Sequence, residues 1–247
     1  MKPQAQQRLQ MIQELVLPED GFTATTFVKD LISQKLVPKE REEEAIAAVL
    51  ATPTLPTVYE GARLALEKMI HGESDVILWT QGDPQVQTAK CDTSRLLDLN
   101  EDENRKGSIK VSAHLNKAEG IAPELTADRL QNKTQIVFVD DKSSQLVAAY
   151  QSMLKLREAD NRNLPPHVIY IWMRRPENTE YKDLLPEGFQ SEQQLSEFIG
   201  GNLVSVTKPE DIPILARTLY FIDLDRTLID AVSWLKNVQE RIALEFA

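Results

Sequence analysis

Cysteine and histidine are scarce in this sequence, which excludes several kinds of site. Cys91 is the single cysteine among 247 residues, so the chain can form neither an internal disulfide nor a cysteine-based zinc cluster. The histidines are His71, His114 and His167. Any metal site is therefore expected to use oxygen ligands, which suit Mg²⁺.

The sequence also lacks an excess of positive charge and a long apolar segment. With 28 basic and 38 acidic residues, its net charge is -10, which repels a phosphate backbone and argues against nonspecific nucleic-acid binding. The glutamine-rich start, Met1 to Leu15, has neither the apolar core of a signal peptide nor the run of about 18 apolar residues that a membrane span needs. We expect a cytoplasmic protein with no membrane or nucleic-acid partner.

Three motifs of nucleotide-binding and hydrolytic enzymes are missing. The chain contains no Gly-x-x-x-x-Gly-Lys-Ser/Thr loop, no Gly-x-Gly-x-x-Gly after a strand and no Gly-x-Ser-x-Gly elbow. These absences argue against a P-loop enzyme, a dinucleotide-binding enzyme and a serine hydrolase of the elbow type.

The first 56 residues contain three helical patterns and no credible strand. The patterns cover Gln4 to Val16, Thr23 to Leu36 and Lys39 to Ala51. Prolines at 53 and 56 then interrupt the helical pattern, because proline lacks a backbone donor and restricts the residue before it. We predict a helical domain over residues 1–56 and a boundary at its end.

From residue 57 onward, helical and strand patterns alternate, which predicts an α/β fold with a parallel sheet and helices on both faces. The predicted strands are 75–80, 108–113, 135–139, 167–173, 203–206 and 218–224. The predicted helices are 58–70, 84–97, 118–130, 143–158, 192–199 and a short one near 210–216. The last strand is almost continuously apolar, as expected of a central strand that is buried on both faces.

The final segment, residues 228–247, is predicted to be a helix with one apolar stripe that needs a partner. The first helix has apolar side chains, such as Leu9 and Ile12, that also need burial. We therefore expect residues 231–247 to complete the helical domain, with residues 57–230 forming the core and the two chain ends close together.

Two predicted strands end in pairs of carboxylates, and strand ends are where ligands bind in open α/β sheets. Asp223 and Asp225 are two residues apart, so they are expected to point to the same side. Asp140 and Asp141 follow another apolar strand. Close carboxylates repel one another unless a cation or a shared proton intervenes, and four of them would suit Mg²⁺.

Two further segments carry groups that bind phosphate. The strand 75–80 delivers the hydroxyl of Thr80, and Gln81 and Gly82 follow in a turn that is expected to have free backbone donors. Lys117 lies just beyond the strand 108–113 and would supply a positive charge to a phosphoryl group.

These four segments resemble the four motifs of the haloacid dehalogenase superfamily. In that family the usual order is Asp-x-Asp-x-Thr, then a strand ending in Thr or Ser, then Lys, then the acidic pair. Here the corresponding order is Thr80, Lys117, Asp140-Asp141 and Asp223-x-Asp225-x-Thr227. The chain is therefore similar to a circularly permuted member whose break lies inside a helical cap.

The resemblance implies a three-layer Rossmannoid core with a central parallel sheet and a small α-helical cap. It also implies a magnesium-dependent phosphatase that acts on a small phosphorylated metabolite. Asp223 would be the nucleophile that becomes an aspartyl-phosphate, and Asp225 would protonate the leaving oxygen and then activate water.

The same resemblance implies two sets of binding groups. The metal ligands would be the carboxylates of Asp140, Asp141 and Asp223 with the main-chain carbonyl of Asp225. The phosphate-binding residues would be Thr80, Gln81, Gly82 and Lys117, and Thr80 and Lys117 would also stabilise charge during catalysis.

Several alternatives stay open at this point. A phosphotransferase or mutase would share the first chemical step, and a catalytically silent binding or regulatory protein would keep the fold; the acidic pairs also suit turns and helix caps. Arg226 replaces a glycine common in the family, and Gln145 replaces a further acidic residue. Trp79, Trp172 and Trp234 are expected to pack in the core or cap.

Overall fold

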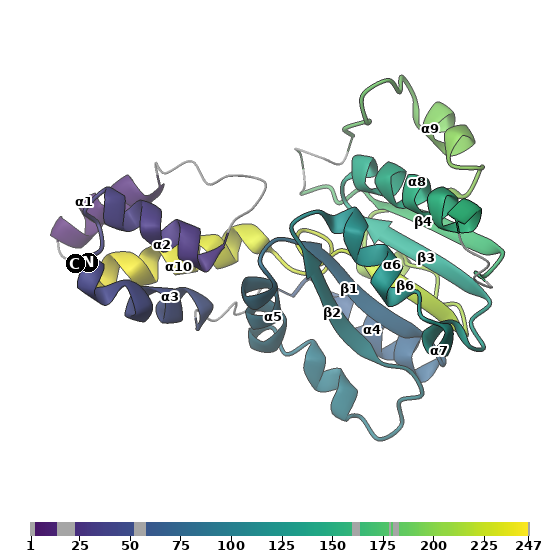
Figure 1. Ribbon diagram of the computed structural model, residues 1–247, viewed down its shortest axis with the longest axis horizontal. Coiled ribbons are helices and arrows are strands. Elements are labelled where there is room, and N and C mark those ends of the chain that lie inside the picture. Colours follow the sequence, from purple (N-terminus) through teal and green to yellow (C-terminus); the bar gives the residue numbers. More distant parts are fainter. Residues whose placement is uncertain are drawn as a thin grey trace.

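The computed structural model describes residues 3–13, 23–51, 58–159, 164–177, 179 and 183–246, which form two units (Figure 1). The helical unit comprises α1 (Pro3–Gln13), α2 (Ala24–Ser33), the 3-10 helix η1 (Lys39–Arg41), α3 (Glu42–Leu50) and α10 (Ala231–Glu245). The α/β unit contains the remaining described elements.

The α/β unit is built on one six-stranded sheet in the order β2-β1-β6-β3-β4-β5, and all neighbouring strands are parallel. The strands are β1 (Asp75–Gln81), β2 (Ile109–His114), β3 (Gln135–Asp140), β4 (His167–Met173), β5 (Leu203–Val206) and β6 (Thr218–Ile222). The prediction of a parallel α/β sheet is confirmed, and the strand that comes last in the sequence lies in the middle of the sheet.

Helices cover both faces of this sheet, so the α/β unit has three layers. Successive side chains of β6 point to opposite faces of the sheet. Leu219 and Phe221 pack toward α6 (Ile121–Glu124), α8 (Ser143–Ala159) and α9 (Glu192–Phe198). Tyr220 and Ile222 pack toward α4 (Ala62–His71) on the other face. The remaining elements are α5 (Pro84–Thr93), α7 (Ala127–Leu130) and the 3-10 helices η2 (Leu97–Glu101), η3 (Lys117–Gly120) and η4 (Pro209–Asp211).

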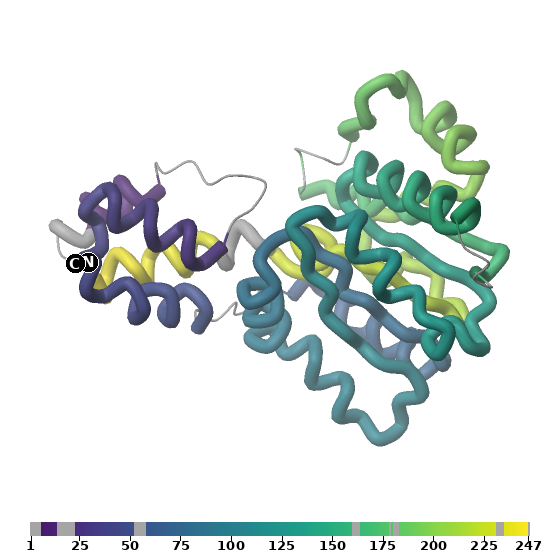
Figure 2. Tube along the Cα trace, viewed as in Figure 1, coloured from purple at the N-terminus to yellow at the C-terminus, as the bar shows by residue number. Residues whose placement is uncertain are grey.

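The helical unit has its own apolar core, to which the last helix contributes. Val238, Ile242 and Phe246 are buried in one cluster with Ile12 and Phe27 of the N-terminal helices. Figure 2 shows the yellow part of α10 lying in the group of α1, α2 and α3. The two ends of the sequence therefore form one packing unit.

Two predicted helices of the α/β unit differ from the observed ones near their starts or centres. The helix expected over 58–70 begins at Ala62, because Gly61 takes the left-handed conformation (φ 81°) and Val58 forms a bridge with Ile229. The helix expected over 118–130 is divided into η3, α6 and α7, and Thr126 caps the last of these with its hydroxyl.

Three further boundaries were also predicted wrongly. The helix expected over 84–97 ends at Thr93, and Arg95 then has a positive φ of 59°. The short helix near 210–216 is only the 3-10 turn η4. The last helix begins at Ala231, because residues 224–229 form a turn in which the Leu228 and Ile229 N–H groups donate to the Leu224 carbonyl.

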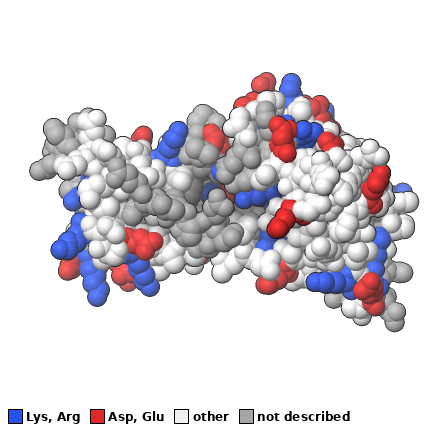
Figure 3. All heavy atoms as spheres, turned by 90° about the horizontal axis from the view of Figure 1, so that it is seen from above, with Lys and Arg blue, Asp and Glu red and all other residues white. Residues whose placement is uncertain are grey.

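Some predictions concern parts outside the described residues: the boundary at 52–56, the last residues of the helix 4–16 and the side chain of Trp234. Within the described residues, no helix is both long and apolar enough to cross a membrane. On the face drawn in Figure 3, acidic and basic side chains of the described residues are interspersed.

Candidate active site

The predicted site residues gather at the carboxyl edge of the sheet, around β6. Because β1, β6 and β3 are parallel neighbours, their carboxyl ends lie at the same edge. Asp223 follows directly after β6, and its N–H donates to the Val139 carbonyl at 2.8 Å. This bond fixes the base of the Asp223 side chain beside the acidic end of β3.

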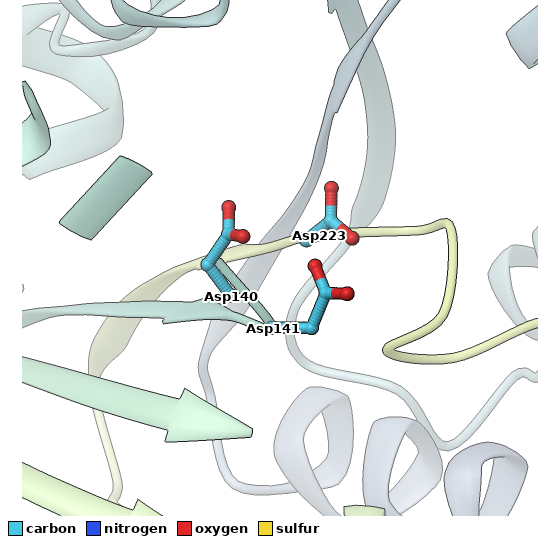
Figure 4. A group of neighbouring side chains, drawn as sticks. All are labelled: Asp140, Asp141 and Asp223. Atoms are coloured by element: carbon cyan, nitrogen blue, oxygen red, sulfur yellow. The ribbon is translucent and has the colours of Figure 1, made fainter. Parts of the chain in front are cut away.

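Three carboxylates from these two strand ends form a compact group. Asp140, Asp141 and Asp223 are all buried, and one oxygen atom from each lies within 4.8 Å of the others. Figure 4 shows the three side chains projecting from the ends of β3 and β6 into one region. The Lys142 N–H donates to the Asp140 carboxylate at 2.8 Å, and the Trp172 indole N–H donates to the Asp141 carbonyl at 3.0 Å.

Lys117 lies inside this acidic group. Its ammonium donates to the Asp223 carboxylate at 2.5 Å and also to Asp140, and the side chain is buried. Burial lowers the pKa of Lys117, but the Asp140 and Asp223 carboxylates more than offset this and raise it to about 12. The Trp79 indole N–H holds the Lys117 carbonyl at 2.7 Å, with the ammonium 4.3 Å from the ring centre.

The acidic group is a candidate cation site. Lys117 contacts two of its three carboxylates, and burial together with the Asp140 and Asp141 carboxylates raises the pKa of Asp223 well above its usual value, although Lys117 opposes the shift. Mg²⁺ prefers oxygen ligands, and three carboxylate oxygens within 4.8 Å of one another are a donor set that can hold a divalent cation.

Thr80 brings an unused hydroxyl to the same place. The residue lies near the end of β1 and is 1% exposed, and its hydroxyl has no hydrogen-bond partner among the described residues. A buried hydroxyl without a partner is unfavourable, by about 1–3 kcal/mol. Its position at the cavity wall is explained if a ligand oxygen supplies the missing partner.

The expectation of a free backbone donor at Gly82 is wrong. Its N–H donates to the His114 carbonyl at 3.0 Å, and Gly82 does not line the cavity. Gly82 has φ 130°, and a Cβ atom there would lie 2.8 Å from the Gln87 amide nitrogen. Glycine is therefore needed for backbone conformation and space. Gln81 does line the cavity.

Asp225 stands apart from the three grouped carboxylates. Its side chain accepts hydrogen bonds from the Lys90 ammonium at 2.9 and 3.0 Å, and the Gln87 amide lies 3.4 Å away. The sequence interpretation missed Lys90 and Gln87. The available signal was their spacing of three residues, which places both on one face of the helix that follows the strand carrying Thr80.

Two departures from the resembled family also line the cavity. Arg226 has φ 63°, a left-handed conformation that glycine adopts more readily, and its N–H donates to the Ile229 carbonyl at 2.7 Å. Gln145 contacts Gln81 at 3.4 Å through the two side-chain amides. The loop therefore keeps a turn conformation with arginine in place of glycine.

The cavity enclosed by these groups measures about 180 Å³. It is lined by Thr80, Gln81, Lys117, Asp140, Asp141, Lys142, Gln145, Asp223, Asp225 and Arg226. A larger hollow of about 1090 Å³ lies between α7 and the segment before β4, and among the described residues that line it only Asp128 and Lys133 are titratable. The smaller cavity is therefore the candidate active site, because the acidic group and Lys117 line it.

Comparison with models of protein families, with curated proteins and with solved structures finds no match to this chain. The function has therefore to be argued from the site itself.

Proposed function

We propose that the protein is a magnesium-dependent phosphohydrolase that forms an aspartyl-phosphate on Asp223. The observation that carries this proposal is a single small cavity that combines a buried carboxylate, an ammonium, a group of oxygen ligands and an unpartnered hydroxyl. A phosphoryl group needs a nucleophile and several positive or donor groups around its oxygens. Asp223, Lys117 and Thr80 supply these.

In the first step, an Asp223 oxygen attacks phosphorus and the bond from phosphorus to the leaving oxygen breaks. The electron pair goes to the leaving oxygen, which takes a proton from the carboxyl group of Asp225. In the second step, a water molecule gives a proton to the Asp225 carboxylate and attacks phosphorus. The bond to Asp223 then breaks, releasing inorganic phosphate and restoring the free carboxylate.

The other groups stabilise and orient the phosphoryl group. Lys117 would donate to the phosphoryl oxygens while it keeps Asp223 in position, and the Thr80 hydroxyl would donate to a further oxygen. Mg²⁺ held by Asp140, Asp141 and Asp223, with the Asp225 carbonyl, would neutralise the repulsion between nucleophile and phosphate.

This site agrees with a circularly permuted haloacid dehalogenase-like core. The resemblance expects the Asp-x-Asp-x-Thr strand in the middle of the sheet rather than at an edge far from Thr80 and Asp140, and β6 lies between β1 and β3. In this proposal the helical unit is the cap, which excludes water and recognises the substrate beyond its phosphate. The cavity of about 180 Å³ suits a small phosphomonoester.

The test is hydrolysis of 4-nitrophenyl phosphate and a panel of sugar and nucleotide monophosphates, with and without Mg²⁺. Wild type is compared with Asp223→Asn and with Asp75→Asn, which alters an ion-paired aspartate at the opposite end of β1. We expect magnesium-dependent turnover in wild type and in Asp75→Asn, and a loss of at least about a thousandfold in Asp223→Asn.

Equal turnover by wild type and Asp223→Asn would reject the proposed nucleophile. Magnesium binding without hydrolysis of any ester would favour a phosphotransferase or a silent binding protein instead.

A further inference from the structure

A partly buried ion pair adjoins the reacting centre, outside the group of three carboxylates. The Lys90 ammonium donates to both oxygens of the Asp225 carboxylate, at 3.0 and 2.9 Å. The Lys90 side chain is 6% exposed and that of Asp225 is 28% exposed, so the lysine is the enclosed partner and the carboxylate reaches the cavity.

The start of α5 determines where Lys90 points. Asp83 caps this helix by accepting the N–H groups of Gln85 and Val86, and Pro84 occupies its first turn. Gln87 and Lys90 are three residues apart, so they share one face of the helix. That face is directed at the turn after β6.

Gln87 ties the same face to the end of β1. Its amide donates to the Gln81 carbonyl at 2.8 Å and lies 3.4 Å from the Asp225 carboxylate. The absence of a side chain at Gly82 makes room for this amide. Asp225 is therefore held by a short helix that is itself fixed to the strand carrying Thr80.

Stability alone does not account for this arrangement. Removing an ammonium from water is costly, and a buried ion pair often contributes no net stability compared with apolar residues of similar size. The pair does fix the orientation of the Asp225 carboxylate, because hydrogen bonds to both oxygens restrict its rotation. Direction matters for a group that must meet the leaving oxygen at hydrogen-bond distance.

We infer that Lys90 is a positioning residue that orients the Asp225 carboxyl group toward the leaving-group oxygen. The inference rests on the proposed function, in which Asp225 exchanges the proton. Lys90 acts through its hydrogen bonds to Asp225 and is not itself assigned a contact with the phosphoryl group.

Leaving-group dependence separates positioning from mere structural support. A misdirected proton donor slows departure of a poor leaving group, whereas a good one departs without help. The experiment measures kcat/KM, which reports steps up to the first irreversible one, for aryl phosphates ranging from phenyl to 4-nitrophenyl phosphate. The variants are Lys90→Met, Asp225→Asn and Lys133→Met.

Lys133→Met is the matched control, because Lys133 is 9% exposed at its side chain and pairs with Asp75 at 2.8 Å, far from the site. For Lys90→Met we expect kcat/KM to fall about 30-fold on phenyl phosphate and about threefold on 4-nitrophenyl phosphate. Asp225→Asn should show the same trend with a steeper dependence of kcat/KM on the leaving group. Lys133→Met should keep the wild-type dependence. Should Lys90→Met fail to fold, Lys90→Gln replaces it with the same expected direction.

An equal loss on all esters, or no loss, would overturn the role of Lys90 and leave the proposed function standing. Failure of wild type on every ester would instead reject the proposed function, and the inference with it.

Discussion

The helical unit and the α/β unit bury different kinds of side chain. In the described part of the helical unit, Gln239 is the one buried polar side chain, and the others are apolar. The α/β unit instead buries Lys117 and three carboxylates around one cavity, and it buries Lys90 next to Asp225 in the cavity wall. Buried charge is unfavourable unless it is fully compensated. We therefore expect the site to lower the stability of the α/β unit, an effect that the apolar core of the helical unit does not have.

The largest effect on stability should come from the apolar core of the helical unit. Phe27→Ala removes a ring that is 1% exposed and leaves a cavity, so the free energy of unfolding should fall by about 3–5 kcal/mol. Leu244→Ala, in the same unit but 57% exposed, should cost less than about 0.5 kcal/mol. Urea denaturation measures both, and equal losses would contradict this account of the helical core.

The next effect separates a hydroxyl kept for chemistry from one kept for structure. Thr80→Val removes an unpartnered buried hydroxyl, so kcat/KM should fall about 10- to 100-fold while stability rises by about 1 kcal/mol. Thr218→Val is the control, because its hydroxyl accepts from Gln135 at 2.9 Å at the opposite end of the sheet. That control should lose stability and keep kcat/KM; the reverse pattern would show that the Thr80 hydroxyl serves packing.

A smaller effect is expected from Trp172, whose indole N–H donates to the Asp141 carbonyl. Trp172→Phe leaves the Asp141 carbonyl without its indole donor, so the affinity for Mg²⁺ should fall about tenfold. Tyr170→Phe changes the residue two positions earlier on the same face of β4 and should leave the affinity unchanged. The affinity of each variant is obtained by titrating turnover with Mg²⁺. Equal affinities in the two variants would show that the indole hydrogen bond does not support the metal site.

The smallest effect is a gain in stability at the proposed nucleophile. The pKa of Asp223 is raised in the folded protein, so wild type should lose stability as the pH rises from the unfolded value near 3.8 through the higher folded value. Asp223→Asn removes that loss and leaves Lys117 paired with Asp140.

We therefore expect metal-free Asp223→Asn to melt about 2–4 °C above wild type at neutral pH, with the difference shrinking toward pH 4. Thermal melts in the presence of EDTA test this. A difference that grows on acidification would contradict the raised pKa.

Sequence patterns predicted the sheet and much of the cavity wall because both follow local rules. Apolar strands that end in Asp140 and Asp223 identify one sheet edge, and parallel strands bring such ends together. The roles of these residues stay predictions. The nearly continuous apolar run of the last strand predicted a central strand, and β6 lies in the middle of the sheet.

Other features depended on contacts between distant segments, and a local pattern does not identify the distant partner. Lys90 meets Asp225 only because α5 and the turn after β6 come together. The N–H of Gly82 was expected to be free, yet the neighbouring strand uses it through His114. The indole donors of Trp79 and Trp172 were expected only to pack, because burial can be predicted from sequence more easily than the partner of a polar atom.

The most direct test of the central claim is to trap the covalent intermediate. Wild type is mixed with Mg²⁺ and a substrate identified in the hydrolysis panel, quenched in acid within one turnover and reduced with borohydride, which converts an aspartyl-phosphate into homoserine. Mass spectrometry of the peptide spanning 218–230 should then find homoserine at Asp223. Turnover with an unmodified Asp223, or with the modification at Asp140, Asp141 or Asp225, would contradict the account.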